Sequence, residues 1–143
     1  MRVTDSSQLF PGKQFISTVL SALDAKTVMS GALIRIYLMR AAMAGAIIGV
    51  MYLTYYAVLA AFEGIATGEL DGVGHMVGAV AFGVALVFIY YSKSELLTSN
   101  MMIVTIGAYY RRAAWWRLLR ILLLCYAGNI VGADDAPGAL PVL

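Results

Sequence analysis

Long uncharged stretches alternate with short charged segments along this chain. Residues 41–62 contain no charged side chain over 22 positions, and residues 73–91 contain none over 19 positions. At about 1.5 Å per residue, 22 helical residues cover about 33 Å, which is enough to cross the hydrocarbon core of a bilayer. A third apolar stretch, 121–133, ends at two aspartates. The pattern predicts helices that span a membrane.

The second stretch continues beyond a short polar interruption at 92–95. Residues 96–110 are again uncharged, so that 73–110 forms a segment of 38 residues. As one straight helix it would be about 57 Å long, nearly twice the bilayer core of about 30 Å. We therefore predict one crossing that is interrupted by a non-helical turn at 92–100. Backbone leaves helical hydrogen bonding at membrane depth only where it is buried in protein or lines a wet cavity.

The chain is predicted to divide into three parts. Residues 1–30 form a polar arm and an amphipathic helix on the membrane surface, residues 31–133 form a membrane domain, and residues 134–143 form a tail. The apolar residues that recur at helical spacing in the first part are Phe15, Val19, Leu20, Leu23 and Val28. The three spans are expected at about 35–62, 73–110 and 113–133.

Composition supports an all-α integral membrane protein. Hydrophobic residues make up 62% of the 143 positions and charged residues 13%, and the mean hydropathy is +0.83. An average soluble domain carries about a quarter charged residues. The net charge of +2 is too small to indicate a nucleic-acid partner. No nucleophile–base pair and no cluster of metal ligands is visible, so we expect no enzyme activity, no cofactor and no metal site.

The basic residues are distributed unevenly between the two sides of the predicted spans. Nine of the ten lie before the uncharged stretch 41–62 or in the segment 111–120 that precedes the last apolar stretch. The loop 63–72 has three acidic residues and no basic one. Because basic loops stay in the cytoplasm, the pattern predicts a multi-pass protein of the cell membrane with a cytoplasmic N-terminus.

Each predicted span carries two glycines four positions apart. Small residues one helical turn apart allow helix backbones to approach closely. The three pairs predict tight helix packing, either within the chain or between subunits. They are Gly45 with Gly49, Gly74 with Gly78, and Gly128 with Gly132.

Two opposite charges, Lys93 and Glu95, lie at the predicted interruption of the second span. Charges at membrane depth commonly mark a transport pathway or a buried ion pair. Two interpretations remain open from the sequence. Lys93 either raises the local concentration of anions, or it extends to an interface and pairs with Glu95.

Three segments resemble the formate/nitrite transporter family of pentameric anion channels. Residues 43–49 are similar to the AGAFIGxG segment of the family's first helix, residues 94–100 to the break in its second helix, and residues 126–133 to the YxGNLVGA segment of its third helix. The resemblance implies half of an aquaporin-like inverted-repeat channel fold. It also implies transport of small monovalent anions, such as formate or nitrite, by a homo-pentamer in a lipid bilayer.

The resemblance also implies roles for particular residues. Phe82 and Leu86 fall on a hydrophobic constriction of the pore, and Thr98 on a loop threonine that offers its hydroxyl to the anion. Two positions depart from the family pattern, because Leu97 replaces an aromatic residue and Lys93 replaces a glycine. Asn100 is expected to anchor the loop through hydrogen bonds to the backbone.

The resemblance stops at Ala133, whereas the family has six spans in two inverted halves. From the sequence we therefore expect a truncated channel that is inactive by itself. Two alternatives are a half-channel that works with a second copy or a separate second half, and a three-span interaction or assembly protein without transport activity. The charge bias argues against insertion of two copies in opposite orientations.

Overall fold

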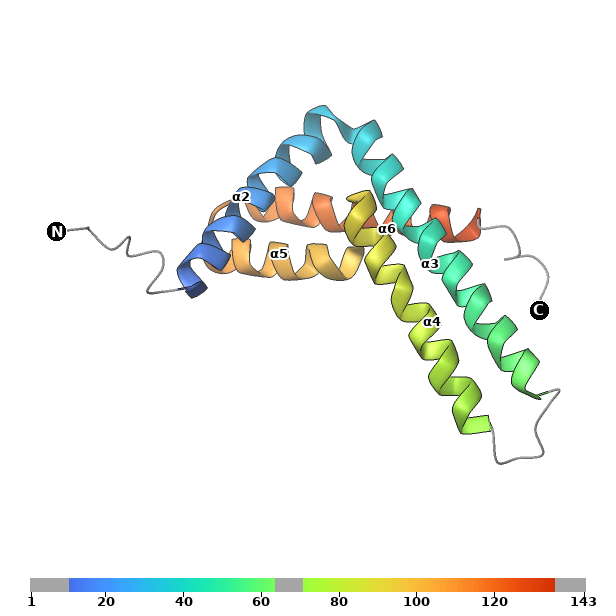
Figure 1. Ribbon diagram of the computed structural model, residues 1–143. Helices are drawn as coiled ribbons and strands as arrows, with labels where there is room; N and C mark the ends of the chain where they lie inside the picture. Colours follow the sequence, from blue (N-terminus) through green and yellow to red (C-terminus); the bar gives the residue numbers. More distant parts are fainter. Residues whose placement is uncertain (1–10, 64–70, 136–143) are drawn as a thin grey trace.

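The computed structural model describes residues 11–63 and 71–135, and every regular element within them is an α-helix. The first ten residues, most of the acidic loop and the last eight residues of the predicted tail lie outside the described residues. The helices are shown in Figure 1 and are α2 (Pro11–Ala32), α3 (Ile34–Glu63), α4 (Asp71–Ser92), α5 (Leu97–Tyr109) and α6 (Trp115–Asp134).

Three of these helices are long and apolar enough to cross a membrane. They are α3 over Ile34–Phe62, α4 over Gly72–Ser92 and α6 over Trp115–Asp134. The prediction of an all-α membrane protein with three spans is therefore confirmed. The helical stretch predicted over 73–110 is interrupted, since α4 ends at Ser92 and the helix resumes as α5 at Leu97.

The interruption is shorter than the range 92–100 suggested by the sequence. Only residues 93–96 are non-helical, because the first turn of α5 already forms hydrogen bonds from Leu97 onward. The Asn100 N–H donates to the Leu96 carbonyl at 3.1 Å, and the Leu97 N–H donates to Asn129 Oδ1 on α6 at 3.1 Å. A side chain from a distant helix therefore takes over the capping that Leu96 cannot provide.

The helices form two antiparallel hairpins that cross each other (Figure 1). Helices α3 and α4 lie side by side in one hairpin, and α5 and α6 lie side by side in the other. Helix α3 packs its first half against α6 and its second half against α4. Helix α2 lies against both α5 and α6.

The hydrophobic core lies where α2, α3, α5 and α6 meet. No residue of α4 belongs to this cluster within the described part of the chain. On α2, Val19 and Leu23 are buried, whereas Phe15 and Val28 of the predicted apolar face are 54% and 60% exposed. The cluster consists of Val19, Leu23, Tyr37, Ala41, Ile103, Val104, Leu118, Ile121 and Cys125.

Five of the six predicted packing glycines face a neighbouring helix of the same chain. A Cβ atom at Gly45 or Gly132 would overlap backbone atoms of the partner helix, and one at Gly128 would lie 2.5 Å from the Ala41 Cβ. On α4, a Cβ at Gly74 or Gly78 would meet an aromatic side chain of α3. The sixth, Gly49, is partly exposed on α3.

Candidate functional site

The backbone between α4 and α5 turns sharply at Lys93, which has a φ angle of 57°. Non-glycine residues rarely adopt this left-handed conformation, which costs about 1–2 kcal/mol. The turn is closed by two backbone hydrogen bonds that end α4. The Lys93 N–H donates to the Tyr90 carbonyl at 3.3 Å, and the Ser94 N–H donates to the Ile89 carbonyl at 3.2 Å. The chain therefore keeps a strained lysine at the break.

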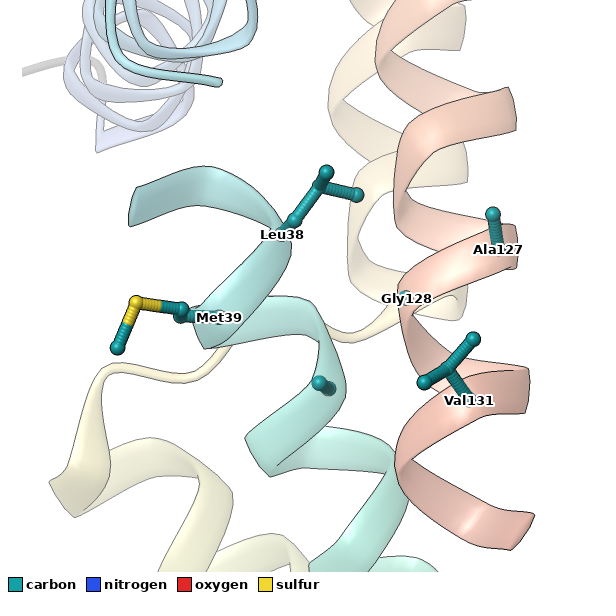
Figure 2. A pocket seen from close by; sticks show the side chains of 6 residues that line it. Leu38, Met39, Ala127, Gly128 and Val131 are labelled. Atoms are coloured by element: carbon teal, nitrogen blue, oxygen red, sulfur yellow. The ribbon is translucent and has the colours of Figure 1, made fainter. Parts of the chain in front are cut away.

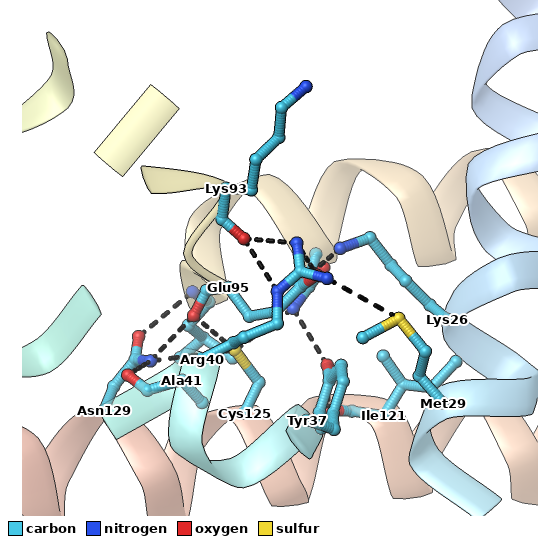
Figure 3. A network of polar contacts seen from close by, with 12 residues as sticks. Lys26, Met29, Tyr37, Arg40, Ala41, Lys93, Glu95, Ile121, Cys125 and Asn129 are labelled. Atoms are coloured by element: carbon cyan, nitrogen blue, oxygen red, sulfur yellow. Dashed lines mark hydrogen bonds and ion pairs between the residues drawn. The ribbon is translucent and has the colours of Figure 1, made fainter. Parts of the chain in front are cut away.

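The Glu95 carboxylate is buried at the centre of this break, with only 4% of the residue exposed. It forms ion pairs with Lys26 on α2 and with Arg40 on α3, and the distance from Arg40 Nη2 to Glu95 Oε1 is 3.5 Å. These groups converge from three separate segments (Figure 3). Two cations thus face one carboxylate, which leaves a positive excess at the break.

The backbone of Glu95 is held as firmly as its side chain. Its N–H donates to the Arg40 carbonyl at 3.1 Å. Its carbonyl accepts hydrogen bonds from Asn129 Nδ2 at 2.9 Å and from the Cys125 thiol at 3.2 Å. Because buried backbone groups are costly to leave unpaired, these bonds allow the chain to depart from helical geometry here.

Asn129 joins the three segments that meet at the break. Its Nδ2 donates to the Ala41 carbonyl of α3 at 2.9 Å as well as to the Glu95 carbonyl, while its Oδ1 accepts from the Leu97 N–H. Both ends of the amide are therefore used. This side chain therefore ties the break between α4 and α5 to both α3 and α6.

A second buried group of polar side chains lies next to the break. Asn100 is 1% exposed, and its Nδ2 donates to the Tyr37 hydroxyl at 3.0 Å and to Cys125 Sγ at 3.1 Å. The Tyr37 hydroxyl in turn donates to the Ile121 carbonyl at 3.2 Å. Asn100 thus contacts side chains of α3 and α6 from within a helix, rather than anchoring a loop.

Lys93 does not pair with Glu95. Its carbonyl oxygen accepts from the Arg40 guanidinium, with Nε at 2.8 Å. Its side chain is exposed and points away from the polar cluster (Figure 3). Because Lys26 and Arg40 are the partners of Glu95, the pairing that the sequence left open between Lys93 and Glu95 is not formed.

The remaining predicted site residues lie on helices rather than in a loop. Leu97 and Thr98 belong with Asn100 to the first turn of α5, and the Thr98 side chain is exposed. On α4, the ring of Phe82 packs edge-on against Tyr52 of α3 with centroids 6.2 Å apart, and Leu86 is 58% exposed. The structure does not bring Phe82 and Leu86 together with the polar cluster at the break.

Sequence reasoning missed the partners of Glu95. Lys26 and Arg40 were counted only as basic residues that precede the first span. A buried carboxylate requires a cationic partner, and this signal pointed to some basic residue. The local pattern offers only the neighbouring Lys93 as a partner and does not indicate Lys26 or Arg40.

Two surface grooves differ in chemistry from the break. A groove of about 400 Å³ lies between α3 and α6 and is lined by apolar groups, including Leu38, Met39 and Val131 (Figure 2). A second groove, of about 300 Å³, lies between α3 and α4 beside Met51 and Phe88. Neither offers a charged side chain, and no metal-binding cluster occurs among the described residues. The polar break is thus the stronger candidate site.

The sequence of this chain matches the family model described as formate/nitrite transporter over residues 13–134. This match covers α3, α4, α5, α6 and the whole break, and α2 from residue 13 on. The chain belongs to the formate/nitrite transporter family. Membership in this family, together with three membrane-length helices, indicates a multi-pass membrane protein.

A relative from Bacillus subtilis (strain 168), named as an uncharacterized transporter YwcJ, is 36% identical over 55 residues. The aligned segment covers 38% of this chain and 22% of that relative. No solved structure matches the chain. For this member of the formate/nitrite transporter family, the residues that contact substrate must therefore be argued from its own geometry.

Proposed function

We propose that this protein conducts small monovalent anions, with formate and nitrite as the candidate substrates, past the break between α4 and α5. The observation that carries the proposal is the break itself. It lies inside the region matched to the transporter family. Its non-helical backbone is held in place by a cluster of charges around the buried Glu95 carboxylate. Irregular backbone at membrane depth is characteristic of a substrate path.

The charge balance at the break favours an anion over a cation. Lys26 and Arg40 together outweigh the single charge of Glu95. Lys93 adds a further exposed positive charge on the same turn. A positive potential in a region of low dielectric constant raises the local concentration of anions.

The start of α5 supplies the neutral donors that a small anion requires. Asn129 occupies the Leu97 N–H, whereas the N–H groups of Thr98 and Ser99 have no partner among the residues that the structure describes. Helix N-termini attract anions because these N–H groups and the helix dipole point outward. We assign the exposed Thr98 hydroxyl to the same site.

The pore constriction proposed at Phe82 and Leu86 requires a second surface on the opposite side of the pore. Leu86 is 58% exposed within the described part of the chain, which makes its side chain available to a surface facing α4. We assign that surface to another chain or to another copy of this one, assembled as a pentameric ring with cytoplasmic N-termini. Phe82, one helical turn away on α4, contributes the other apolar side chain of the constriction.

The test is anion flux into liposomes that contain the purified protein. Vesicles are exposed to inward gradients of isotopically labelled formate and then of nitrite, the anion taken up is measured directly, and empty liposomes provide the baseline. We expect flux above this baseline, reduced about tenfold by Thr98→Ala, which corresponds to about 1.4 kcal/mol in the barrier. Thr98→Ser retains the hydroxyl and is expected to restore the flux.

Two variants make the test specific to the residues proposed. Ser99→Ala removes a neighbouring exposed hydroxyl and is expected to leave flux unchanged. Lys93→Gly removes an exposed positive charge from the break and is therefore expected to lower the flux. Because glycine adopts the left-handed conformation without strain, the substitution is not expected to lower stability. Flux equal to that of empty liposomes would refute the transport proposal for this chain and favour a role in membrane assembly. Equal losses in Thr98→Ala and Ser99→Ala would refute the role of Thr98.

A further inference from the structure

A small groove on α6 combines apolar walls with one cationic side chain. Its volume is about 190 Å³. It is lined by Trp116, Leu119, Arg120, Leu123 and Leu124. The other four lining residues are apolar or aromatic, so none of them is an acidic partner for the Arg120 guanidinium. The lining therefore does not neutralise the positive charge of Arg120.

Arg120 carries a buried hydrogen-bond donor without an acceptor. Its Nε is buried and has no partner among the described residues. The guanidinium lies against Gly31 on α2, where a Cβ atom would be 3.1 Å from Arg120 Nη2. Since buried donors in native proteins are almost always satisfied, the unpaired Nε indicates an acceptor that the described residues do not supply.

The surroundings of the groove are strongly positive. Four arginines lie between positions 111 and 120, and Arg112 is the one that forms an ion pair in the described part of the chain, with Asp24 at 3.1 Å. The N-cap of α6, Ala114, provides no side-chain hydrogen bond to the first turn. The uncapped end of the helix therefore adds its partial positive charge to that of the arginines.

The two tryptophans of the chain lie beside this positive region. Trp115 and Trp116 are 72% and 74% exposed. Exposed tryptophans next to arginines are typical of the level at which lipid headgroups meet acyl chains. Leu119 and Leu123 then continue the groove along α6 away from the arginines.

We propose that this groove binds one anionic phospholipid, with its phosphate on Arg120 and an acyl chain along Leu119 and Leu123. The occupant must be anionic to satisfy Arg120 and apolar to cover the leucines, and a phospholipid of the surrounding bilayer has both properties. A free phosphate ion would satisfy only the charge. The proposal does not depend on the transport function, because it concerns no residue of the break.

Trp115 and Trp116 provide the probe for a test in the intact protein. The protein is reconstituted in phosphatidylcholine with increasing mole fractions of phosphatidylglycerol whose acyl chains are brominated and quench tryptophan. A parallel series contains brominated phosphatidylcholine instead. We expect quenching to saturate at a low fraction of the anionic lipid, with an apparent affinity about fivefold higher than that for phosphatidylcholine.

Two charge-matched variants separate the groove from the general basic surface. Arg120→Gln is expected to abolish the fivefold preference, whereas Arg111→Gln removes the same charge outside the groove and is expected to retain it. Far-UV circular dichroism of both variants in the same vesicles checks that the helices are intact. Equal loss of the preference in both variants would indicate that a diffuse electrostatic surface, and not the groove, attracts the anionic lipid. This result would overturn the proposal.

The unmodified protein also tests the proposal without any variant. Equal quenching by the two brominated lipids at every mole fraction would overturn it. Soluble glycerol phosphate carries the same phosphate without an acyl chain, so we expect millimolar amounts to leave the preference unchanged. Displacement of the lipid by this soluble anion would identify a free phosphate site instead.

Discussion

The two halves of α3 pack in different ways, although the helix that faces each half carries two glycines four positions apart. The first half meets α6 backbone to backbone, because a Cβ atom at Gly132 would overlap the Ala42 carbonyl and one at Gly45 would overlap the Asn129 carbonyl. The second half meets α4 through aromatic rings that cover glycines. A Cβ at Gly78 would lie 2.8 Å from Cδ2 of the Tyr55 ring.

This difference separates a rigid contact from an adaptable one. A backbone carbonyl in a helix cannot move without shifting the whole element, whereas an aromatic ring can rotate. The rigid contact is also the one that holds the break, since Arg40 of α3 pairs with the Glu95 carboxylate and Asn129 of α6 donates to the Glu95 carbonyl. We infer that the α3–α6 contact fixes the candidate site and that the α3–α4 contact tolerates change.

The largest effect is expected at the buried carboxylate. Glu95→Gln leaves Lys26 and Arg40 without their anion, and breaking a buried pair in this way costs about 3–5 kcal/mol. The measurement is the free energy of unfolding by SDS in mixed micelles. The double variant Lys26→Gln with Glu95→Gln is expected to recover part of the loss, and no recovery would indicate that the pair is not coupled.

A loss of about 3 kcal/mol, at the upper end for overpacking, is expected for Gly132→Ala. The added methyl group meets the Ala42 carbonyl of α3, so α6 must move as a whole. The same SDS titration measures the change. A stability equal to that of the unmodified protein would show that α3 and α6 do not touch through their backbones.

A smaller loss, of about 1 kcal/mol, is expected for Gly78→Ala on α4. Here the methyl group meets the Tyr55 ring, which can turn aside. The additional substitution Tyr55→Leu removes the ring and is expected to cancel most of the effect. If Gly78→Ala destabilises the protein as much as Gly132→Ala, the distinction between a rigid and an adaptable contact is wrong.

The smallest effect is expected for Gly83→Ala on the same helix. Apart from the neighbouring residues and backbone of α4 itself, no atom lies within 4 Å of the Cβ position at Gly83, and the residue is exposed. Without a clash, alanine is favoured over glycine in a helix by up to about 1 kcal/mol. The SDS titration should therefore show unchanged or slightly higher stability, and a clear loss would reveal a contact on this face of α4.

The fold was largely predictable because the signals for it are local. Uncharged stretches such as 41–62 and the excess length of 73–110 predicted the spans and the interruption from the sequence alone. The extent of the interruption was less predictable. The Leu97 N–H is capped by Asn129, a residue 32 positions away, and no local pattern announces that bond.

The sequence by itself determined that the chain is apolar, helical and broken once, because hydrophobicity and length act on each segment separately. It also marked Glu95 as a charge that needs a partner. Only the tertiary structure decided that the partners are Lys26 and Arg40 rather than the neighbouring Lys93. The left-handed turn at Lys93 directs that side chain outward, while the crossing of α2 and α3 brings the other two cations to the buried carboxylate.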